Sequence, residues 1–480
     1  MDPINTETWL PLISRAVAYT AMVTKLAWIL HLMARAVRAS LSPGYERLAW
    51  VKGDRGLVRF FTVAYEFMLL LPLELIGEYA RQPESVVSFN TYVRDVMHAK
   101  YTLFGDNVLD NNTQKPIVYR ELFQKLSDKM GMMNEELVLA MKAVLIPDEK
   151  GEINMWDTAT KFLSRTSNRI IVGHPLCRNQ EYLDAAVHYA VSMFSTAVYI
   201  QFIPPFLRPL LAPLLRRSLT RDRDIVAKHA IPIIEERMRL IELAEETGVE
   251  PGLPNDLLSA AMNVARKDPN SSLEYTPIML VNRILAFNFL QSYSNTLTLT
   301  NSVYDLISLP EDLFNQTVTD LRNLRTNPIG EVGLERTIMS KDGFTFSNGL
   351  HVPKGATLAA PMKAIQHDAK NYPGGFNPKR ALQDPTRPRI TAISPDFLNF
   401  GLGRPACSGR WFAANLQKLA LGQLIMDFDF ERVDERPQGV RKITLVEPTF
   451  TLLLIQNRTL IDFDCSSVMI FLAGKDTERW

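Results

Sequence analysis

The sequence predicts a mainly α-helical protein with a small β portion, and two observations carry this prediction. Most of the first two thirds of the chain repeats its apolar residues with the 3.6-residue period of helices, as in residues 224–246, which Gly248 and Pro251 bring to an end. Residues 336–361 alternate instead in short runs, separated by Asp-Gly, Asn-Gly and Lys-Gly pairs typical of tight hairpins. We therefore expect a small sheet late in a helical chain.

The N-terminal segment is apolar but interrupted by charge. Arg15, Lys25 and Arg35 divide residues 9–36 into uncharged runs shorter than the roughly 20 residues that a spanning helix needs. Two interpretations stay open: a membrane anchor, or an amphipathic helix that lies on a membrane surface or packs on the protein. We expect residues 1–40 to form this segment and residues 41–480 to form one folded domain, with an atypical tail at 458–480.

Two apolar stretches follow in the middle of the chain. Residues 185–207 carry no Asp, Glu, Lys or Arg, and Pro204 and Pro205 end any helix there, so we expect a buried or membrane-grazing helix. Residues 208–217 then read as an apolar loop with basic edges, at a membrane interface or in the core. Residues 276–309 would extend about 50 Å as one helix. Their hydroxyl- and amide-rich centre favours a helix that lines a polar spot inside a core.

Composition and motifs exclude several classes of function. The 480 residues are 46% hydrophobic and 22% charged, which is typical of a globular protein, and the net charge of +1 gives no field that would attract nucleic acid. The cysteines at 177, 407 and 465 are too few and too far apart for a disulfide framework or a zinc site. The common phosphate-binding, hydrolase-elbow and zinc-protease motifs are absent, and the seven histidines are scattered.

Residues 400–425 carry the strongest chemical signal. Gly401 and Gly403 allow the backbone to bend tightly around a bound group. Cys407 then precedes an amphipathic helix that begins near Ser408. The helix N-terminus is expected to lower the pKa of the thiol, which suits a metal ligand or a nucleophile. The alternative for a lone cysteine is a small buried apolar residue.

This loop resembles that of a known family. Its residues match the haem-binding pattern FGxGxxxCxG of the cytochrome P-450 family at Phe400, Gly401, Gly403, Cys407 and Gly409. The resemblance implies the fold of that family, with a long central helix over a haem (iron protoporphyrin IX) and Cys407 as the axial thiolate ligand of the iron. Residues 41–480 would then be a single haem-thiolate catalytic domain.

Other cofactor contacts follow from the same resemblance. Phe400, Gly403 and Gly409 would shape the haem loop. Pro405 occupies a position that is often basic in the family, so Arg404 and Arg336 are the candidate partners of the haem propionates.

Further segments match the family in the expected order. Residues 376–380 resemble its FxPxR segment, Arg325 resembles the arginine of its ExxR helix, and residues 352–356 resemble its IPKGT turn. Residues 173–179 and 298–311 resemble filamentous-fungal members that act in secondary metabolism. One departure is clear: Arg322 stands where the family has the glutamate of ExxR, and two arginines cannot form that salt bridge.

The long helix departs from the family as well. Alignment places Tyr293 and Ser294 where the family has the acid-alcohol pair that delivers protons to bound oxygen. A hydroxyl relay through these residues, bridged by water, is one interpretation. The other is that both are polar residues satisfied within their own helix.

The resemblance implies a membrane-associated monooxygenase, at the endoplasmic reticulum with a cytosolic catalytic domain. It would use O2 and electrons from NADPH-cytochrome P-450 reductase, docked where Arg404, Arg410 and Lys418 lie, to oxidise a hydrophobic substrate such as a terpenoid or related fungal metabolite. Residues 185–207, Phe289 and Leu290 would line the cavity. Two alternatives remain: a degenerate haem binder without catalysis, suggested by the ExxR change, and a haem-free helical interaction protein.

Overall fold

The computed structural model describes eight stretches of the chain: residues 58–60, 68–104, 107–110, 114–149, 152–307, 327–373, 390–432 and 469–474. Several expectations lie outside the described residues. They concern the membrane segment at 1–40, the Arg322 and Arg325 positions, residues 376–380, and the tail residues 458–468 with Cys465. Among the described residues, no helix is both long enough and apolar enough to cross a membrane.

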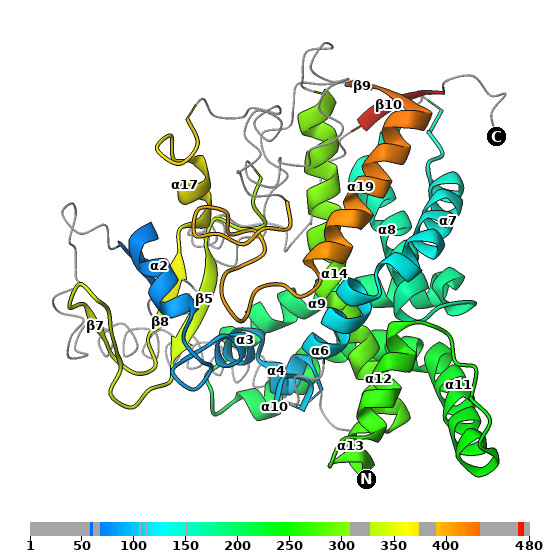
Figure 1. Cartoon of the computed structure of the whole chain (residues 1–480), viewed down its shortest axis with the longest axis horizontal. Coiled ribbons are helices and arrows are strands. Elements are labelled where there is room, and N and C mark those ends of the chain that lie inside the picture. The colour runs from blue at the N-terminus through cyan, green and yellow to red at the C-terminus, as the bar shows by residue number, and fades with distance from the viewer. Residues whose placement is uncertain are drawn as a thin grey trace, which may run out of the picture.

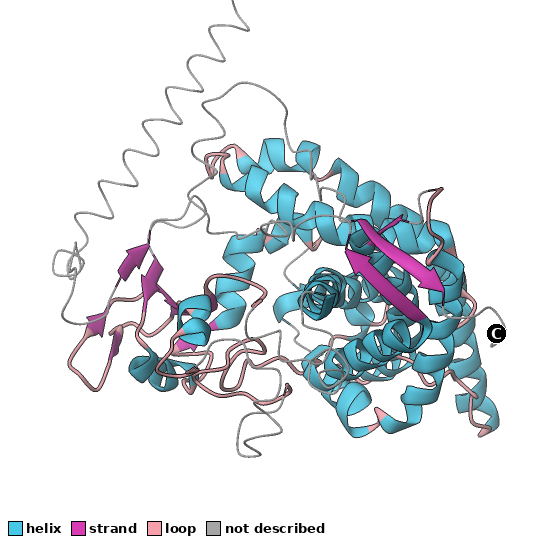
Figure 2. Ribbon diagram, turned by 90° about the horizontal axis from the view of Figure 1, so that it is seen from above, coloured by secondary structure: helices cyan, strands magenta, loops and turns pink. Residues whose placement is uncertain are grey.

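Helices make up most of the described chain, which confirms the predicted class (Figure 2). They are α2 (Leu73–Ala80), α3 (Phe89–Met97), α4 (Ala99–Thr102), α5 (Asn107–Asp110), α6 (Gln114–Tyr119), the π-helix η1 (Arg120–Gln124), α7 (Ser127–Val144), α8 (Met155–Ile171), the 3₁₀-helix η2 (Leu176–Arg178), α9 (Gln180–Gln201), α10 (Arg208–Leu215), α11 (Arg217–Thr247), α12 (Leu257–Arg266), α13 (Ser271–Glu274), α14 (Pro277–Ile307), α17 (Met362–His367) and α19 (Arg410–Asp427). In Figure 1, most of them pack together on one side of the molecule, while α2 and α17 lie with the larger sheet on the other.

The helix ends follow from local sequence. The Asn179 side chain accepts a hydrogen bond from a backbone N–H in the first turn of α9, and the Asp256 carboxylate does the same for α12. Helix α9 ends at Gln201, just before the Pro204-Pro205 pair, and α11 ends at Thr247 with Gly248 as its C-cap, at a φ of 74°. Residues 208–215 correct the prediction of a loop, because they form the short helix α10.

Helix α14 is the long central helix that the sequence predicts, and it packs against α8, α9, α11 and α19. Its polar residues have partners inside the core. Asn288 exchanges side-chain hydrogen bonds of 2.8 and 3.2 Å with Asn168 of α8, and the Tyr182 hydroxyl of α9 donates to the same Asn168. The Gln417 amide of α19 donates to the backbone carbonyl of Asn295 at 2.9 Å. These bonds hold α14 in register with the helices around it.

The larger sheet has five strands in the order β1 (Val58–Phe60), β2 (Met68–Leu70), β8 (Thr357–Ala360), β5 (Gly333–Ile338) and β3 (Val87–Ser88). Strands β2 and β8 are parallel, and the other pairs are antiparallel. The expected hairpins are confirmed, because β6 (Phe344–Thr345) pairs with β7 (His351–Val352), and Gly343, Gly349 and Gly355 take φ values of 74°, 81° and 83° at the turns.

A second sheet involves the atypical tail. Strand β10 (Met469–Gly474) pairs antiparallel with both β4 (Glu152–Asn154) and β9 (Phe428–Arg432). Figure 2 shows β9 and β10 lying over the helical part. Part of the tail is therefore integrated into the fold.

Candidate functional site

The loop before α19 is a closed turn held by its own backbone. The N–H of Cys407 donates to the carbonyl of Phe400 at 2.8 Å, and the N–H of Gly401 donates to the carbonyl of Leu398 at 2.8 Å. Gly401 and Gly403 have φ values of 75° and 74°, in the region that residues with a side chain avoid. The two glycines predicted to bend the chain therefore do so.

Gly403 also sets the distance between this loop and α2. A Cβ atom built on Gly403 would lie 1.9 Å from the carbonyl oxygen of Ala80, whereas one on Gly401 would meet its nearest atom, Ala406 Cα, at 3.5 Å. Only glycine fits at 403, because the backbone of the loop rests directly on the end of α2.

Cys407 is exposed and lies two residues before Gly409, the N-cap of α19. Although part of the residue is open to solvent, the protein atoms packed around its sulfur desolvate the thiolate and raise the pKa of the thiol, and the backbone N–H groups of Gly409 and Arg410, bonded to the sulfur, offset this only in part. The expectation of a lowered pKa is therefore wrong in its net direction. The helix N-terminus acts as expected, but the sequence does not reveal the stronger effect of desolvation.

The two candidate propionate partners have different environments. Arg404 is exposed in the loop itself. Arg336 is buried in β5, where its guanidinium lies 4.8 Å from the centre of the Phe89 ring and donates to the carbonyl of Glu335. Burial lowers the pKa of Arg336 below its ordinary value. Arg404 is thus placed as a surface charge and Arg336 as a buried one.

Tyr293 and Ser294 face different surroundings on α14. The Tyr293 ring packs against Trp156 of α8, with centroids 5.7 Å apart, and against Phe194 of α9. Ser294 is half-buried and lies one turn after Leu290, whose side chain is 62% exposed. Since consecutive residues differ by about 100° around a helix, the open face of α14 carries Leu290 and Ser294, while the tyrosine ring lies against α8 and α9.

The structure brings together a cluster that the sequence reasoning did not single out. Within the segment 173–179, His174 and Cys177 come close to the Glu136 carboxylate of α7. Arg165 and Arg178 already donate to that carboxylate at 2.6 and 2.7 Å. Burial raises the pKa of Cys177 to about 11, so its thiol is protonated at neutral pH. We interpret the cluster as a structural tie between α7, α8 and η2.

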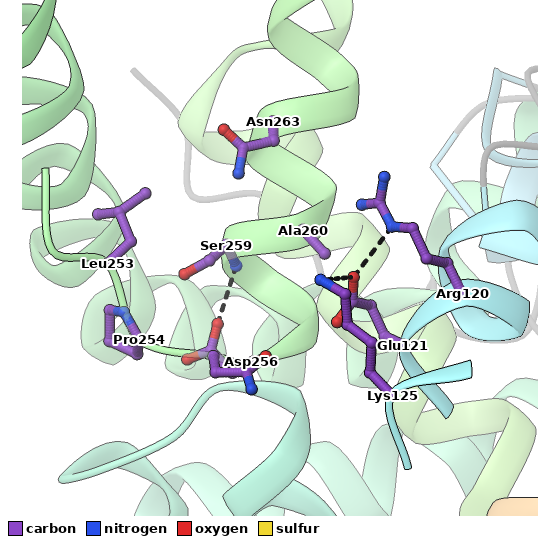
Figure 3. Close-up of a pocket in the computed structure, with 10 residues that line it drawn as sticks. Arg120, Glu121, Lys125, Leu253, Pro254, Asp256, Ser259, Ala260 and Asn263 are labelled. Carbon is purple, nitrogen blue, oxygen red and sulfur yellow. Dashed lines mark hydrogen bonds and ion pairs between the residues drawn. The ribbon is translucent and has the colours of Figure 1, made fainter. Parts of the chain in front are cut away.

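A cavity of about 250 Å³ lies between η1 and α12 (Figure 3). Arg120 and Lys125 border it on the η1 side, and both pair with the buried carboxylate of Glu121, which Lys129 also contacts. Burial alone would raise the pKa of Glu121, but these three cations bring it below its ordinary value. The charged side chains at this cavity are therefore engaged with one another, and the loop around Cys407 does not line it.

The donor chemistry around Cys407 fits a thiolate-ligated haem. The Cys407 sulfur receives two backbone N–H groups, and the loop carries no side chain at 401, 403 or 409.

Comparison with known proteins agrees with this geometry. The family model described as "Cytochrome P450" matches residues 323–454, which include the loop. The cytochrome P-450 monooxygenase 151 of Postia placenta is 30% identical, over 76% of this chain and 79% of its own. The monooxygenase gloP of Glarea lozoyensis is 27% identical, over 87% and 85%. The chain therefore belongs to the cytochrome P-450 family, that is, to the haem-dependent monooxygenases whose iron is held by a cysteine thiolate.

Proposed function

We propose that Cys407 would supply the thiolate that holds the haem iron and that the protein inserts one oxygen atom of O2 into an apolar substrate. The observation that carries this proposal is the closed glycine loop, which presents the Cys407 sulfur at the start of α19 with two N–H groups directed at it. The haem supplies the activation of O2, which consumes two electrons and two protons for each oxygen atom inserted and releases water.

The remaining contacts are assigned to residues of the same region. Phe400, Gly403 and Gly409 would shape the loop that holds the haem, and their positions in the closed turn support this role. Arg404 and Arg336 would bind the haem propionates, since a guanidinium binds a carboxylate through two parallel hydrogen bonds.

Ser294 holds and passes a proton through its hydroxyl, supported by its place on the open face of α14. Tyr293 is its neighbour in this relay. Because Trp156 and Phe194 fix the tyrosine ring, we assign Tyr293 the secondary part.

The substrate is a hydrophobic molecule, and we propose a terpenoid or related fungal secondary metabolite. Leu290 on the open face of α14, with Phe289 beside it and Phe194 of α9 packed on that ring at 5.0 Å, supports an apolar lining. The relatives from Glarea lozoyensis and Penicillium canescens, both named as cytochrome P-450 monooxygenases, support a fungal type of enzyme.

Electrons come from NADPH-cytochrome P-450 reductase. We place its docking surface at the loop and the outer face of α19, where Arg404 and Lys418 are both exposed. Their positive charge suits an acidic partner and would give an association rate that falls with ionic strength.

Membrane association at the endoplasmic reticulum, with the domain 41–480 in the cytosol, is part of the same proposal. It is supported by α10 and the residues before it, where Phe206, Leu210 and Leu214 follow one another at four-residue spacing and are 76%, 71% and 50% exposed. A chain that begins near Ser42 should still bind vesicles through this stripe. Its complete release into detergent-free buffer without vesicle binding would assign the membrane contact to residues 1–40 alone.

The absorption spectrum of the dithionite-reduced protein with carbon monoxide tests the central assignment. The native chain should show the red-shifted Soret band of a thiolate trans to carbon monoxide, Cys407→Ala should lose it, and the control Cys465→Ala should keep it. Haem bound without this band would indicate a degenerate member, in line with Arg322. Colourless protein would indicate a haem-free interaction protein.

A further inference from the structure

Arg410, the first residue of α19, is turned back onto the loop that carries Cys407. Its Nη1 donates to the carbonyl of Cys407 at 2.7 Å, and its Nε donates to the carbonyl of Thr391 at 3.0 Å. One guanidinium therefore joins two stretches of irregular backbone. Arg404 in the same loop and Lys418 on α19 are exposed instead.

The guanidinium of Arg410 also packs on a stack of aromatic rings. The guanidinium carbon of Arg410 lies 3.5 Å from the centre of the Trp411 ring. The Trp411 ring lies 3.9 Å from that of Phe123 in η1 at an interplanar angle of 31°, and Tyr119 lies 5.1 Å from Phe123. A cation on an aromatic face is attracted by the ring quadrupole, so the charge is held in one position.

The positive charge of Arg410 lies next to the residue that would bind the iron, because its guanidinium contacts the backbone carbonyl of Cys407. A charge fixed by two carbonyls and a ring is screened less by water and salt than that of a freely moving surface arginine.

We propose that Arg410, held by Trp411 and the two carbonyls, is a positioning residue that fixes the Cys407 loop and raises the reduction potential of the iron bound there. This inference rests on the proposed role of Cys407 as ligand. Reduction of the iron adds one negative charge to the site, so a fixed cation stabilises the reduced form more than the oxidised form. The reduction potential must therefore fall when the charge is removed.

The test is the midpoint potential of the purified haem-loaded full-length chain. In Arg410→Gln the side chain can still donate to a carbonyl but has no charge. We expect the equilibrium between reduced and oxidised iron to shift about tenfold toward the oxidised form, which corresponds to about 59 mV for one electron. Arg410→Lys keeps the charge and should restore more than half of this shift.

Two further variants separate a positioned charge from the general basicity of the surface. Trp411→Leu leaves the arginine in place without its ring and should shift the equilibrium in the same direction by a smaller factor. Lys370→Gln removes one exposed charge that has no part in the proposed haem site and should change it less than twofold. Equal shifts in Lys370→Gln and Arg410→Gln would overturn the inference, as would an unchanged potential in Arg410→Gln.

The carbon monoxide spectrum of each variant keeps the two hypotheses apart. If the parent chain lacks the thiolate band, the role of Cys407 fails. If the parent shows the band, only the potentials decide the role of Arg410. Should Arg410→Gln lose its haem, Trp411→Leu takes its place: a lowered potential supports the inference, and the parent potential contradicts it.

Discussion

Gly403 and Gly401 form a matched pair for measuring how tightly the Cys407 loop rests on α2. Their φ values differ by one degree, so an alanine at either position costs about 1–2 kcal/mol for the left-handed conformation. Only at 403 does the new Cβ meet backbone, 1.9 Å from the carbonyl oxygen of Ala80. Relieving that overlap requires the loop or α2 to move, which typically costs a further ~1–3 kcal/mol.

The assay is urea unfolding of the haem-loaded chain, together with the amplitude of the carbon monoxide band. We expect Gly403→Ala to lower the free energy of unfolding by ~1–3 kcal/mol more than Gly401→Ala does, and to reduce the fraction of protein that shows the band. Equal losses in the two variants would mean that α2 yields without cost, and would refute the role assigned to this contact.

Three other predictions concern the rest of the fold. Burial alone would raise the pKa of Glu136, but Arg178 and Arg165 bring it below its ordinary value of 4.5. The carboxylate therefore stabilises the fold above pH 4.5, and this stabilisation is lost as the pH falls through the lower pKa of the folded state. In urea titrations across this range, Glu136→Gln should lose less stability on acidification than the parent. Tyr182→Phe removes one buried hydrogen bond to Asn168 and should lower the free energy of unfolding by about 1 kcal/mol. An unchanged free energy would mean that this hydrogen bond does not stabilise the fold. Serine at both Leu210 and Leu214 should change that free energy by less than about 0.5 kcal/mol for each residue but reduce co-sedimentation with lipid vesicles, whereas unchanged co-sedimentation would contradict the role of the α10 stripe.

Local signals in the sequence predicted the parts of the fold that depend on local structure. The hairpin turns at Gly343, Gly349 and Gly355 lie where the dipeptides indicated, and α9 ends before its proline pair. Strand β2 was not foreseen, because three residues carry little periodicity and their partner β8 lies far along the chain. Pairing between strands so far apart in the sequence depends on the whole folded chain and cannot be predicted from a short sequence segment.

The candidate site divides in the same way. The glycine loop and the helix after Cys407 were readable from residue types, although α19 begins at Arg410 rather than near Ser408. The pKa of Cys407 was predicted in the wrong direction, because desolvation depends on what packs around the sulfur. The stacking of Arg410 on Trp411 was missed although the two are adjacent, since side-chain direction at a helix start is set by tertiary contacts. The relay through Tyr293 and Ser294 remains a prediction.

The parallel pairing of β2 with β8 has a consequence for the order in which the protein is made. About 290 residues separate Leu70 from Thr357, so at about 5–20 residues per second the ribosome needs roughly 15–60 s to deliver the partner of the first strands. Of the two strands that flank β2 in the described sheet, β1 alone has been synthesised during that time. The sheet whose strand β2 precedes α2, on which Gly403 rests, is therefore completed only when the C-terminal part of the chain has been made. Until then the unpaired edge of β2 is exposed in the nascent chain and could pair with another chain and aggregate.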